Sequence, residues 1–197
     1  MGEVRVRQEI WLVRHGETEW SITGQHSGRT DLPLTARGED EARDVARFLE
    51  ARRFDHVWCS PLQRARRTCE ISGFASVARI EPNLQEWDYG DCTGYTQEQL
   101  AERYPGWNIW AGPVPNGESI EEIAGRACRV VERLRTLEGR VVIFAHGHFL
   151  RVLATQWLGL APQSGRNLAL ETSGVCVLGY DAGFPAIRVW NLRAGAG

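Results

Sequence analysis

Two runs of consecutive apolar residues constrain the fold of this chain more than any other feature. Val141–Ala145 contains five apolar residues in succession and Ile10–Val13 contains four. Short runs without a polar residue are typical of buried strands. A third short run, His56–Cys59, has the same character. We therefore expect these segments to be strands in the interior of the protein.

Amphipathic segments alternate with these strands along the chain. After Thr35, apolar residues recur with the spacing of a helix, and Ser119 and Glu122 have the spacing of a capping box at the start of a long helix. Leu150–Trp157 continues the helical spacing after the last apolar run. Strands that alternate with helices indicate an α/β domain with a mostly parallel sheet.

The last third of the chain has a different pattern. Val175–Tyr180 and Ala186–Leu192 resemble strands, and Asp181-Ala182-Gly183 between them predicts a hairpin at the sheet edge. The Trp- and Gly-rich stretch Tyr104–Glu118 is expected to be an excursion above the sheet. We predict a single domain over residues 1–197 with a three-layer α/β/α fold, a mostly parallel central sheet and an antiparallel edge strand.

Both of the longest apolar runs end on a histidine followed by glycine. Arg14-His15-Gly16 follows the first run and His146-Gly147 follows the second. The carboxyl ends of parallel strands line the crevice where ligands bind, so these side chains should converge on one pocket. Arg64 comes shortly after the strand at His56–Cys59 and should join them.

Two imidazoles and two guanidinium groups form a pocket suited to a dianionic phosphoryl group. A neutral imidazole can attack phosphorus and become phosphohistidine, with arginines stabilising the charge on the phosphoryl oxygens. The leaving alkoxide needs a proton, which a carboxyl group near the pocket could supply. Glu86 and Asp88 are both candidates, and the chemistry alone does not choose between them.

The chain resembles the histidine phosphatase superfamily, also called the phosphoglycerate mutase-like family, from about Ile10 to Leu158. The resemblance implies that His15 is the phosphorylated nucleophile, that Glu86 is the proton donor and that no metal or cofactor takes part. The segments that carry it are Arg14–Thr18, Ser27-Gly28, Asp31–Thr35, Ser60–Ala65, Leu84–Gly90, Gly117–Ser119 and Ala145–His148. The resemblance also implies that Arg14, Arg64 and His146 complete the phosphate pocket, and we expect Ser27, Gly28 and Gly147 to contribute to substrate binding.

Two departures from the family pattern bear on activity. The mutases usually carry asparagine six positions after the nucleophile, whereas this chain has Ser21, which we keep as a phosphate contact. The segment between Glu86 and His146 is also shorter than in the mutases, which favours the phosphatase branch. Stretches around Glu86, Trp107 and Phe144 are similar to sugar-bisphosphatase members. We therefore expect phosphorylated sugars or bisphosphates as substrates, with a cofactor-dependent phosphoglycerate mutase as the alternative.

Two further alternatives belong to other classes of protein. His146 and His148 could be metal ligands, but a pair two residues apart is a weak signal. A phosphate-binding module without turnover would have no need of a nucleophile, two arginines and an acid together.

Several other side chains could serve either the site or the structure. His148 could lie at the pocket rim or at the surface, and His26 could reach the substrate from its loop. Trp107 and Trp110 could cap the site or pack in the core. Arg66, Arg67 and His56 are expected to lie outside the site, the arginines on a solvated face.

Charge and cysteine content exclude some classes of partner. The formal net charge is −2, which gives no sign of a nucleic-acid or membrane partner. The five cysteines are scattered without a Cys-x-x-Cys pair, and no signal peptide or membrane-spanning run is present, so a cytoplasmic protein is expected. The expected partner is a small phosphorylated substrate, and the edge hairpin could pair across a homodimer.

Overall fold

The computed structural model describes residues 8–194 and contains a six-stranded sheet. The strands lie in the order β3-β2-β4-β1-β5-β6. β1, β2, β3 and β4 run parallel to one another, whereas β5 is antiparallel to β1 and β6 is antiparallel to β5. The bounds are β1 Glu9–Arg14, β2 His56–Cys59, β3 Arg79–Ile80, β4 Arg140–Ala145, β5 Gly174–Asp181 and β6 Phe184–Arg193.

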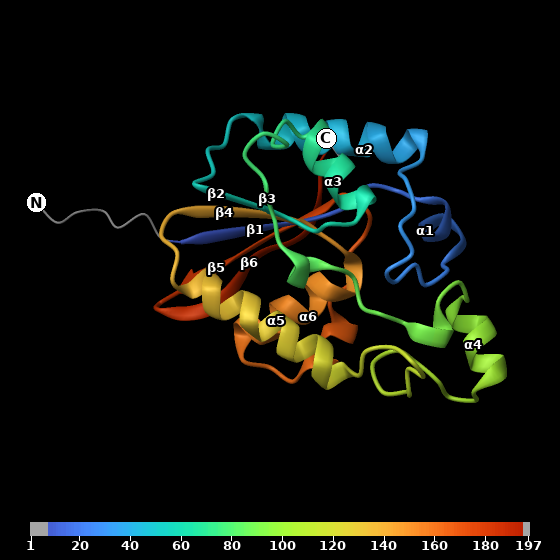
Figure 1. Ribbon diagram of the computed structural model, residues 1–197. Coiled ribbons are helices and arrows are strands. Elements are labelled where there is room, and N and C mark those ends of the chain that lie inside the picture. The colour runs from blue at the N-terminus through green and yellow to red at the C-terminus, as the bar shows by residue number, and fades with distance from the viewer. Residues whose placement is uncertain (1–7, 195–197) are drawn as a thin grey trace, which may run out of the picture.

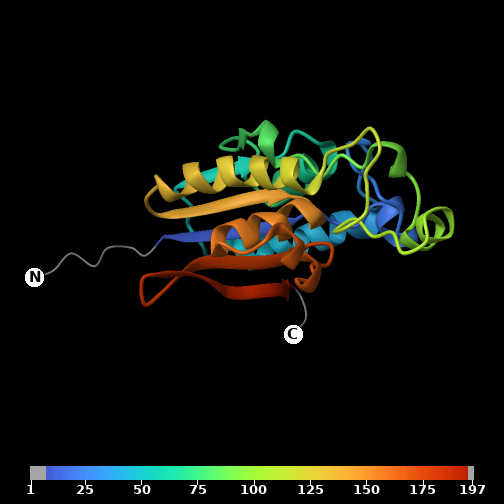
Figure 2. The ribbon, with the colours of Figure 1, turned by 90° about the horizontal axis from the view of Figure 1, so that it is seen from below.

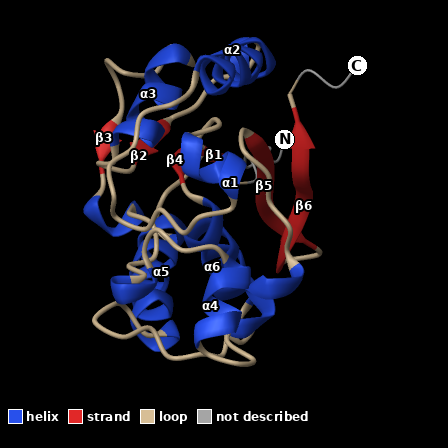
Figure 3. Ribbon diagram, turned by 90° about the vertical axis from the view of Figure 1, so that its right-hand side faces the viewer, coloured by secondary structure: helices blue, strands red, loops and turns tan. Residues whose placement is uncertain are grey.

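Helices cover the two faces of this sheet, which confirms the predicted three-layer fold (Figures 1 and 3). α2 (Ala36–Glu50) and α3 (Gln63–Ile71) lie on one face. α5 (Ile120–Arg135) and α6 (Gly147–Leu158) lie on the other. The short helices α1 and α4, at Glu19–Thr23 and Gln97–Arg103, lie beyond the carboxyl ends of the parallel strands, at the right of Figure 1.

The continuous apolar runs are explained by a core on each face of the sheet. Along β4, Val141, Ile143 and Ala145 pack in the core under α5 and α6. Val142 and Phe144 pack in the core under α2 and α3. Successive residues of a strand point to opposite faces, so a strand covered on both sides needs apolar residues at every position.

Capping side chains fix where the long helices begin. The Thr35 hydroxyl accepts a hydrogen bond from the Gly38 amide at the start of α2. Ser119 and Glu122 form the predicted capping box at the start of α5. α3 begins at Gln63, and Leu62 before it provides no side-chain capping bond.

The C-terminal hairpin has the predicted turn and longer strands than predicted. Ala182 and Gly183, between β5 and β6, both have positive φ, which matches a tight two-residue hairpin turn. Figure 2 shows β5 and β6 side by side at one edge of the sheet. Within residues 8–194, no helix has both the length and the apolar character needed to cross a membrane.

Candidate active site

His15 follows the last residue of β1 and is held in place by both neighbouring strands. Its amide donates to the Ala145 carbonyl at the end of β4 at 3.0 Å, and its carbonyl accepts from the Ser173 amide before β5 at 3.1 Å. The side chain is 4% exposed. The imidazole is therefore fixed at the carboxyl end of the central strand.

The hydrogen bonds of His15 leave Nε2 as an acceptor. Nδ1 lies 2.7 Å from the Gly16 carbonyl, which can only accept, so Nδ1 carries the hydrogen. Burial, with the charges of Arg64 and Arg14, lowers the pKa of His15 well below its usual value of 6.5. His15 is thus a neutral imidazole with a lone pair on Nε2, the form that a nucleophile needs.

Arg64 connects the two histidines. Its Nε lies 3.2 Å from His15 Nε2 and 3.2 Å from His146 Nδ1. Its two terminal nitrogens donate to the carbonyls of Gly28 and Thr30, at 2.7 and 2.8 Å. The guanidinium comes from the first turn of α3 and is 1% exposed. It is therefore held rigidly between the two imidazoles.

His146 comes at the end of β4 and faces His15. The two ring centroids are 5.2 Å apart. Nε2 lies 2.7 Å from the Ser60 hydroxyl, so the neutral ring donates to Ser60 and accepts from Arg64. Burial, with the charges of Arg64, His15 and Arg14, lowers the pKa of His146 well below 6.5.

Arg14 lies against the start of α6. Its Nη1 donates to the Leu170 carbonyl at 2.6 Å, while its buried Nε has no hydrogen-bond partner in residues 8–194. A Cβ at Gly147 would come within 3.3 Å of the Arg14 guanidinium carbon, so glycine there permits the close approach. A buried N–H without a partner is costly, and a ligand oxygen would satisfy it.

Glu86 faces the first turn of α6. Its Oε1 accepts from the amides of Trp87 and Phe149, both at 2.9 Å, and its Oε2 accepts from the His148 amide at 3.1 Å. The side chain is 6% exposed. Asp88, the other candidate acid, forms an ion pair with Arg29 at 3.1 Å and does not line the cavity.

A cavity of about 180 Å³ brings most of the predicted site residues together. His26 and His148, whose places the sequence left open, both line it. Its walls are Arg14, His15, Trp20, Ser21, Gly24, Gln25, His26, Ser27, Arg64, Glu86, Tyr89, Gly147, His148, Arg151 and Leu170. His146 lies behind His15 and Arg64, fully buried.

Three of the predicted binding residues differ in how they relate to the cavity. Ser21 lines the cavity, but its hydroxyl is used in the cap of α1, accepting from the Thr18 amide and donating to the Thr18 carbonyl, both at 2.8 Å. Ser27 also lines the cavity. Gly28 contributes its carbonyl to Arg64 and has φ of 51°, a conformation that favours glycine. Direct substrate contacts by these residues stay predictions.

Several residues that line the cavity were not singled out from the sequence, among them Trp20, Tyr89 and Arg151. Trp20 comes from α1, which was not predicted, and Tyr89 is three residues after Glu86. Arg151 is four residues after Gly147 and therefore shares its helix face, a spacing that could have revealed it. Trp107 and Trp110 pack in the core and are absent from the cavity wall.

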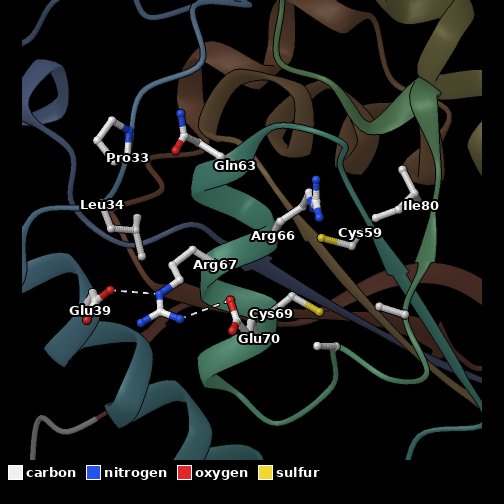
Figure 4. A pocket seen from close by; sticks show the side chains of 12 residues that line it. Pro33, Leu34, Glu39, Cys59, Gln63, Arg66, Arg67, Cys69, Glu70 and Ile80 are labelled. Carbon is white, nitrogen blue, oxygen red and sulfur yellow. Dashed lines mark hydrogen bonds and ion pairs between the residues drawn. The ribbon is translucent and has the colours of Figure 1, made fainter.

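A second, larger cavity has Gln63 and Glu70 of α3 in its wall (Figure 4). It measures about 710 Å³, and Arg66 and Arg67 line it. Arg67 pairs with Glu39 and Glu70, as the dashed lines show. These arginines lie outside the histidine site, as predicted. Arg14, His15 and Glu86 line the smaller cavity and not this one, so its size does not make it the catalytic centre.

The metal-site alternative finds no support in the contacts of the two histidines. The nitrogens of His146 are bonded to Arg64 and Ser60, and Nδ1 of His148 lies 2.6 Å from the Tyr89 hydroxyl. Within the described part of the chain, no three potential metal ligands gather.

A model of the histidine phosphatase superfamily (branch 1) matches residues 10–193. The chain belongs to the histidine phosphatase superfamily. Its match extends beyond Leu158 to include the C-terminal hairpin. This histidine phosphatase is 35% identical to an acid phosphatase of Mycobacterium tuberculosis over 187 residues, covering 93% of this chain and 92% of the relative.

A second relative and a solved structure agree with this assignment. A sedoheptulose 1,7-bisphosphatase of Saccharomyces cerevisiae is 35% identical over 184 residues, covering 77% of this histidine phosphatase and 68% of the relative. The structure of the open reading frame Rv3214 from Mycobacterium tuberculosis superposes with a TM-score of 0.90 at 32% identity, covering 95% of this chain and 98% of that one.

Proposed function

We propose that this phosphatase hydrolyses phosphomonoesters of small metabolites through a phosphohistidine on His15. The observation that carries the proposal is the neutral His15, whose Nε2 is an acceptor beside two arginines and a second histidine. Arg14 contributes an unpartnered Nε to the same place. This arrangement suits a phosphoryl group that is both bound and attacked.

In the first step, the Nε2 lone pair of His15 attacks phosphorus, the N–P bond forms and the ester P–O bond breaks. Arg14 and Arg64 stabilise the charge on the phosphoryl oxygens, and His146 holds the Arg64 guanidinium in place from behind. Glu86 gives its proton to the leaving alkoxide. In the second step, Glu86 takes a proton from water as the water oxygen attacks phosphorus, and the N–P bond breaks to release phosphate.

The substrates that we propose are sugar phosphates or bisphosphates. The sedoheptulose 1,7-bisphosphatase relative supports this class. The five cysteines are all free, which supports the proposal that the enzyme works in the reducing cytoplasm.

Phosphate release from a panel of sugar phosphates, phosphoglycerates and an aryl phosphate tests the function, with excess chelator and His15→Ala as the control. We expect release that survives the chelator and disappears in the variant. Interconversion of phosphoglycerates that requires a bisphosphate primer, with little free phosphate, would instead identify a mutase. Activity that is unchanged in His15→Ala would contradict the role of His15.

A further inference from the structure

Arg151 lines the catalytic cavity at a distance from the phosphate-binding groups. It lies four residues after Gly147 on the same face of α6, about 6 Å further along the helix axis. Its Nε donates to the Gly165 carbonyl at 2.9 Å and its Nη2 to the Arg166 carbonyl at 3.1 Å. Its guanidinium carbon lies 4.6 Å from the centroid of the Trp110 ring. The position of this cation is therefore well defined.

The bonds to the Gly165 and Arg166 carbonyls do not use every N–H donor of the Arg151 guanidinium. Within residues 8–194, Nη1 of Arg151 has no hydrogen-bond partner, and no carboxylate lies within 4.0 Å of the side chain. The two bonds to carbonyls explain how Arg151 anchors the segment after α6. They do not explain why a cation without a carboxylate partner lines the catalytic cavity.

His148 presents a hydrogen-bond donor on the same wall. Burial raises the pKa of Tyr89 well above 10 and lowers the pKa of His148 well below 6.5, so both groups are neutral. The Tyr89 hydroxyl lies 2.6 Å from His148 Nδ1. When the hydroxyl donates across this contact, the hydrogen of the neutral imidazole is on Nε2. Because His148 lines the cavity, this N–H is available to a ligand.

The charges of the cavity exceed what one phosphate can balance. The wall contains three arginines, Arg14, Arg64 and Arg151, and one carboxyl group, Glu86. When Glu86 holds the proton that it will transfer, the arginines contribute three positive charges. A phosphomonoester dianion balances two of them, and an additional anionic group on the substrate would balance the third.

We propose that Arg151 and His148 form a second oxyanion subsite, so that the enzyme prefers phosphomonoesters whose leaving group carries another phosphate or a carboxylate. The proposal rests on the proposed function and deepens it. The subsite supplies a guanidinium N–H and an imidazole N–H, which are the donors that oxyanions prefer. The anion would be several bonds away from the phosphorus that His15 attacks.

The test compares Arg151→Met with Arg135→Met. Arg135 is a matched control because it also donates to a backbone carbonyl, that of Trp157 at 3.1 Å, and also stacks on a tryptophan, but it is at the other end of α5 from the site. Phosphate release is measured with p-nitrophenyl phosphate, fructose 6-phosphate, fructose 1,6-bisphosphate and 3-phosphoglycerate. Thermal unfolding of each variant reports on its stability.

For the wild type we expect a higher kcat/KM with a substrate that carries a second anionic group than with fructose 6-phosphate, whose single phosphate is its only anionic group. In Arg151→Met this preference should fall by roughly tenfold to a hundredfold, the range for a charge-assisted hydrogen bond to an anion, whereas Arg135→Met should keep it. The bisphosphate and the phosphoglycerate distinguish a second phosphate from a carboxylate. Arg151→Lys, which keeps the positive charge but loses the paired N–H donors of the guanidinium, should show an intermediate preference for substrates with a second anionic group.

An equal change with all four substrates, or an unchanged preference in both Arg151 variants, would overturn the subsite. So would a wild-type enzyme with no preference for a second anion. These outcomes differ from failure of the proposed function, in which no substrate would release phosphate in a His15-dependent way.

Discussion

The single carboxyl group on the cavity wall has a position that suits proton transfer. Glu86 is fixed by the backbone amides of Trp87, His148 and Phe149 rather than by a cation. Among residues 8–194, no other carboxyl group lines the cavity, and Asp88 pairs instead with Arg29. The structure thus favours Glu86 in the choice that the side-chain chemistry had left open.

Replacing Glu86 by glutamine should therefore harm some substrates more than others. An alkyl phosphate has a poor leaving group that needs the proton, and its kcat should fall by roughly 10²- to 10⁴-fold. An aryl phosphate has a stable leaving group and should lose much less. Steady-state kinetics with fructose 6-phosphate and p-nitrophenyl phosphate measure both. Equal losses would show that Glu86 is not the acid.

A second prediction concerns the protonation of the nucleophile. Because burial and the charges of Arg64 and Arg14 lower the pKa of His15, its imidazole should stay neutral across the physiological pH range. A histidine-detected NMR titration of the free enzyme, with His15 assigned from His15→Ala, should show no midpoint for this ring between about pH 6.5 and 8. A midpoint at or above about 6.5 would be incompatible with the buried site.

The loop after β1, which holds His15, and the first turn of α2 contact each other through backbone atoms rather than side chains. A Cβ at Gly16 would lie 2.3 Å from the Gly38 carbonyl oxygen, and a Cβ at Gly38 would lie 2.2 Å from the Glu17 carbonyl oxygen. The first turn of α2 therefore presses directly on the loop that holds His15. The sequence revealed Gly16 through its histidine, but it gave no reason to connect Gly38 with the site.

Gly38→Ala should accordingly reduce both stability and activity. Its methyl group cannot fit unless α2 or the His15 loop shifts, and overpacking of this kind costs about 1–3 kcal/mol. Gly125→Ala is the control, since a Cβ there meets only the Arg129 guanidinium at 3.9 Å in the middle of α5. That change should stabilise the protein by about 0.5–1 kcal/mol. Urea unfolding measures both, and a neutral Gly38→Ala would disprove the close contact.

At this scale, the sequence predicted the strands and long helices better than the short elements. The runs at β1 and β4 are unambiguous because both faces of these strands are covered. α1 and α4 have only 5 and 7 residues, too few for a periodic pattern to emerge. Trp20 was missed for this reason.

Across the whole molecule, Arg126 ties the segment around Glu86 to α5. Its guanidinium donates to the carbonyls of Asn83, Gln85 and Glu86 at 2.6–3.2 Å and pairs with Glu118 at 2.7 Å. The side chain is 8% exposed. Asn83, Gln85 and Glu86 precede Arg126 by 40–43 residues, so no local pattern could predict the cluster.

Arg126→Met should destabilise the protein by about 1–3 kcal/mol at neutral pH, because three backbone carbonyls and the half-buried Glu118 carboxylate would lose this donor. Burial alone would raise the pKa of Glu118, but the hydrogen bond and charge of Arg126, together with the Asp88 amide and the charge of Arg29, outweigh it and hold that pKa below 4.5. The stability from Glu118 is therefore complete above about pH 4.5 and is lost as pH falls through the folded-state pKa.

The difference in unfolding free energy between wild type and Arg126→Met should accordingly shrink in acid, as measured by urea unfolding at pH 7 and pH 3.5. Arg43→Met serves as the control, since Arg43 pairs with Glu39 and Asp40 on an exposed surface and should contribute no more than about 1 kcal/mol. If the difference in unfolding free energy between wild type and Arg126→Met did not change with pH, the pair with Glu118 would not be the source of that difference.

The C-terminal third of the chain shows most clearly what the sequence could not predict. The Leu170 carbonyl binds Arg14, and the Ser173 amide binds the His15 carbonyl. The hairpin was predicted as an edge feature, yet the segment that leads into it completes the catalytic pocket. Backbone groups make both contacts, so the identities of these two residues could not predict them.

The direction of the strands also matters for attaching this enzyme to a solid support. The chain enters β1 at Glu9, about 20 Å from the end that bears the catalytic histidine. It leaves β6 at Arg193, which pairs with Gly174 next to the catalytic loop. A tether joined ahead of β1 would turn the open pocket toward the bulk solution, whereas one joined after β6 would press the pocket against the bead.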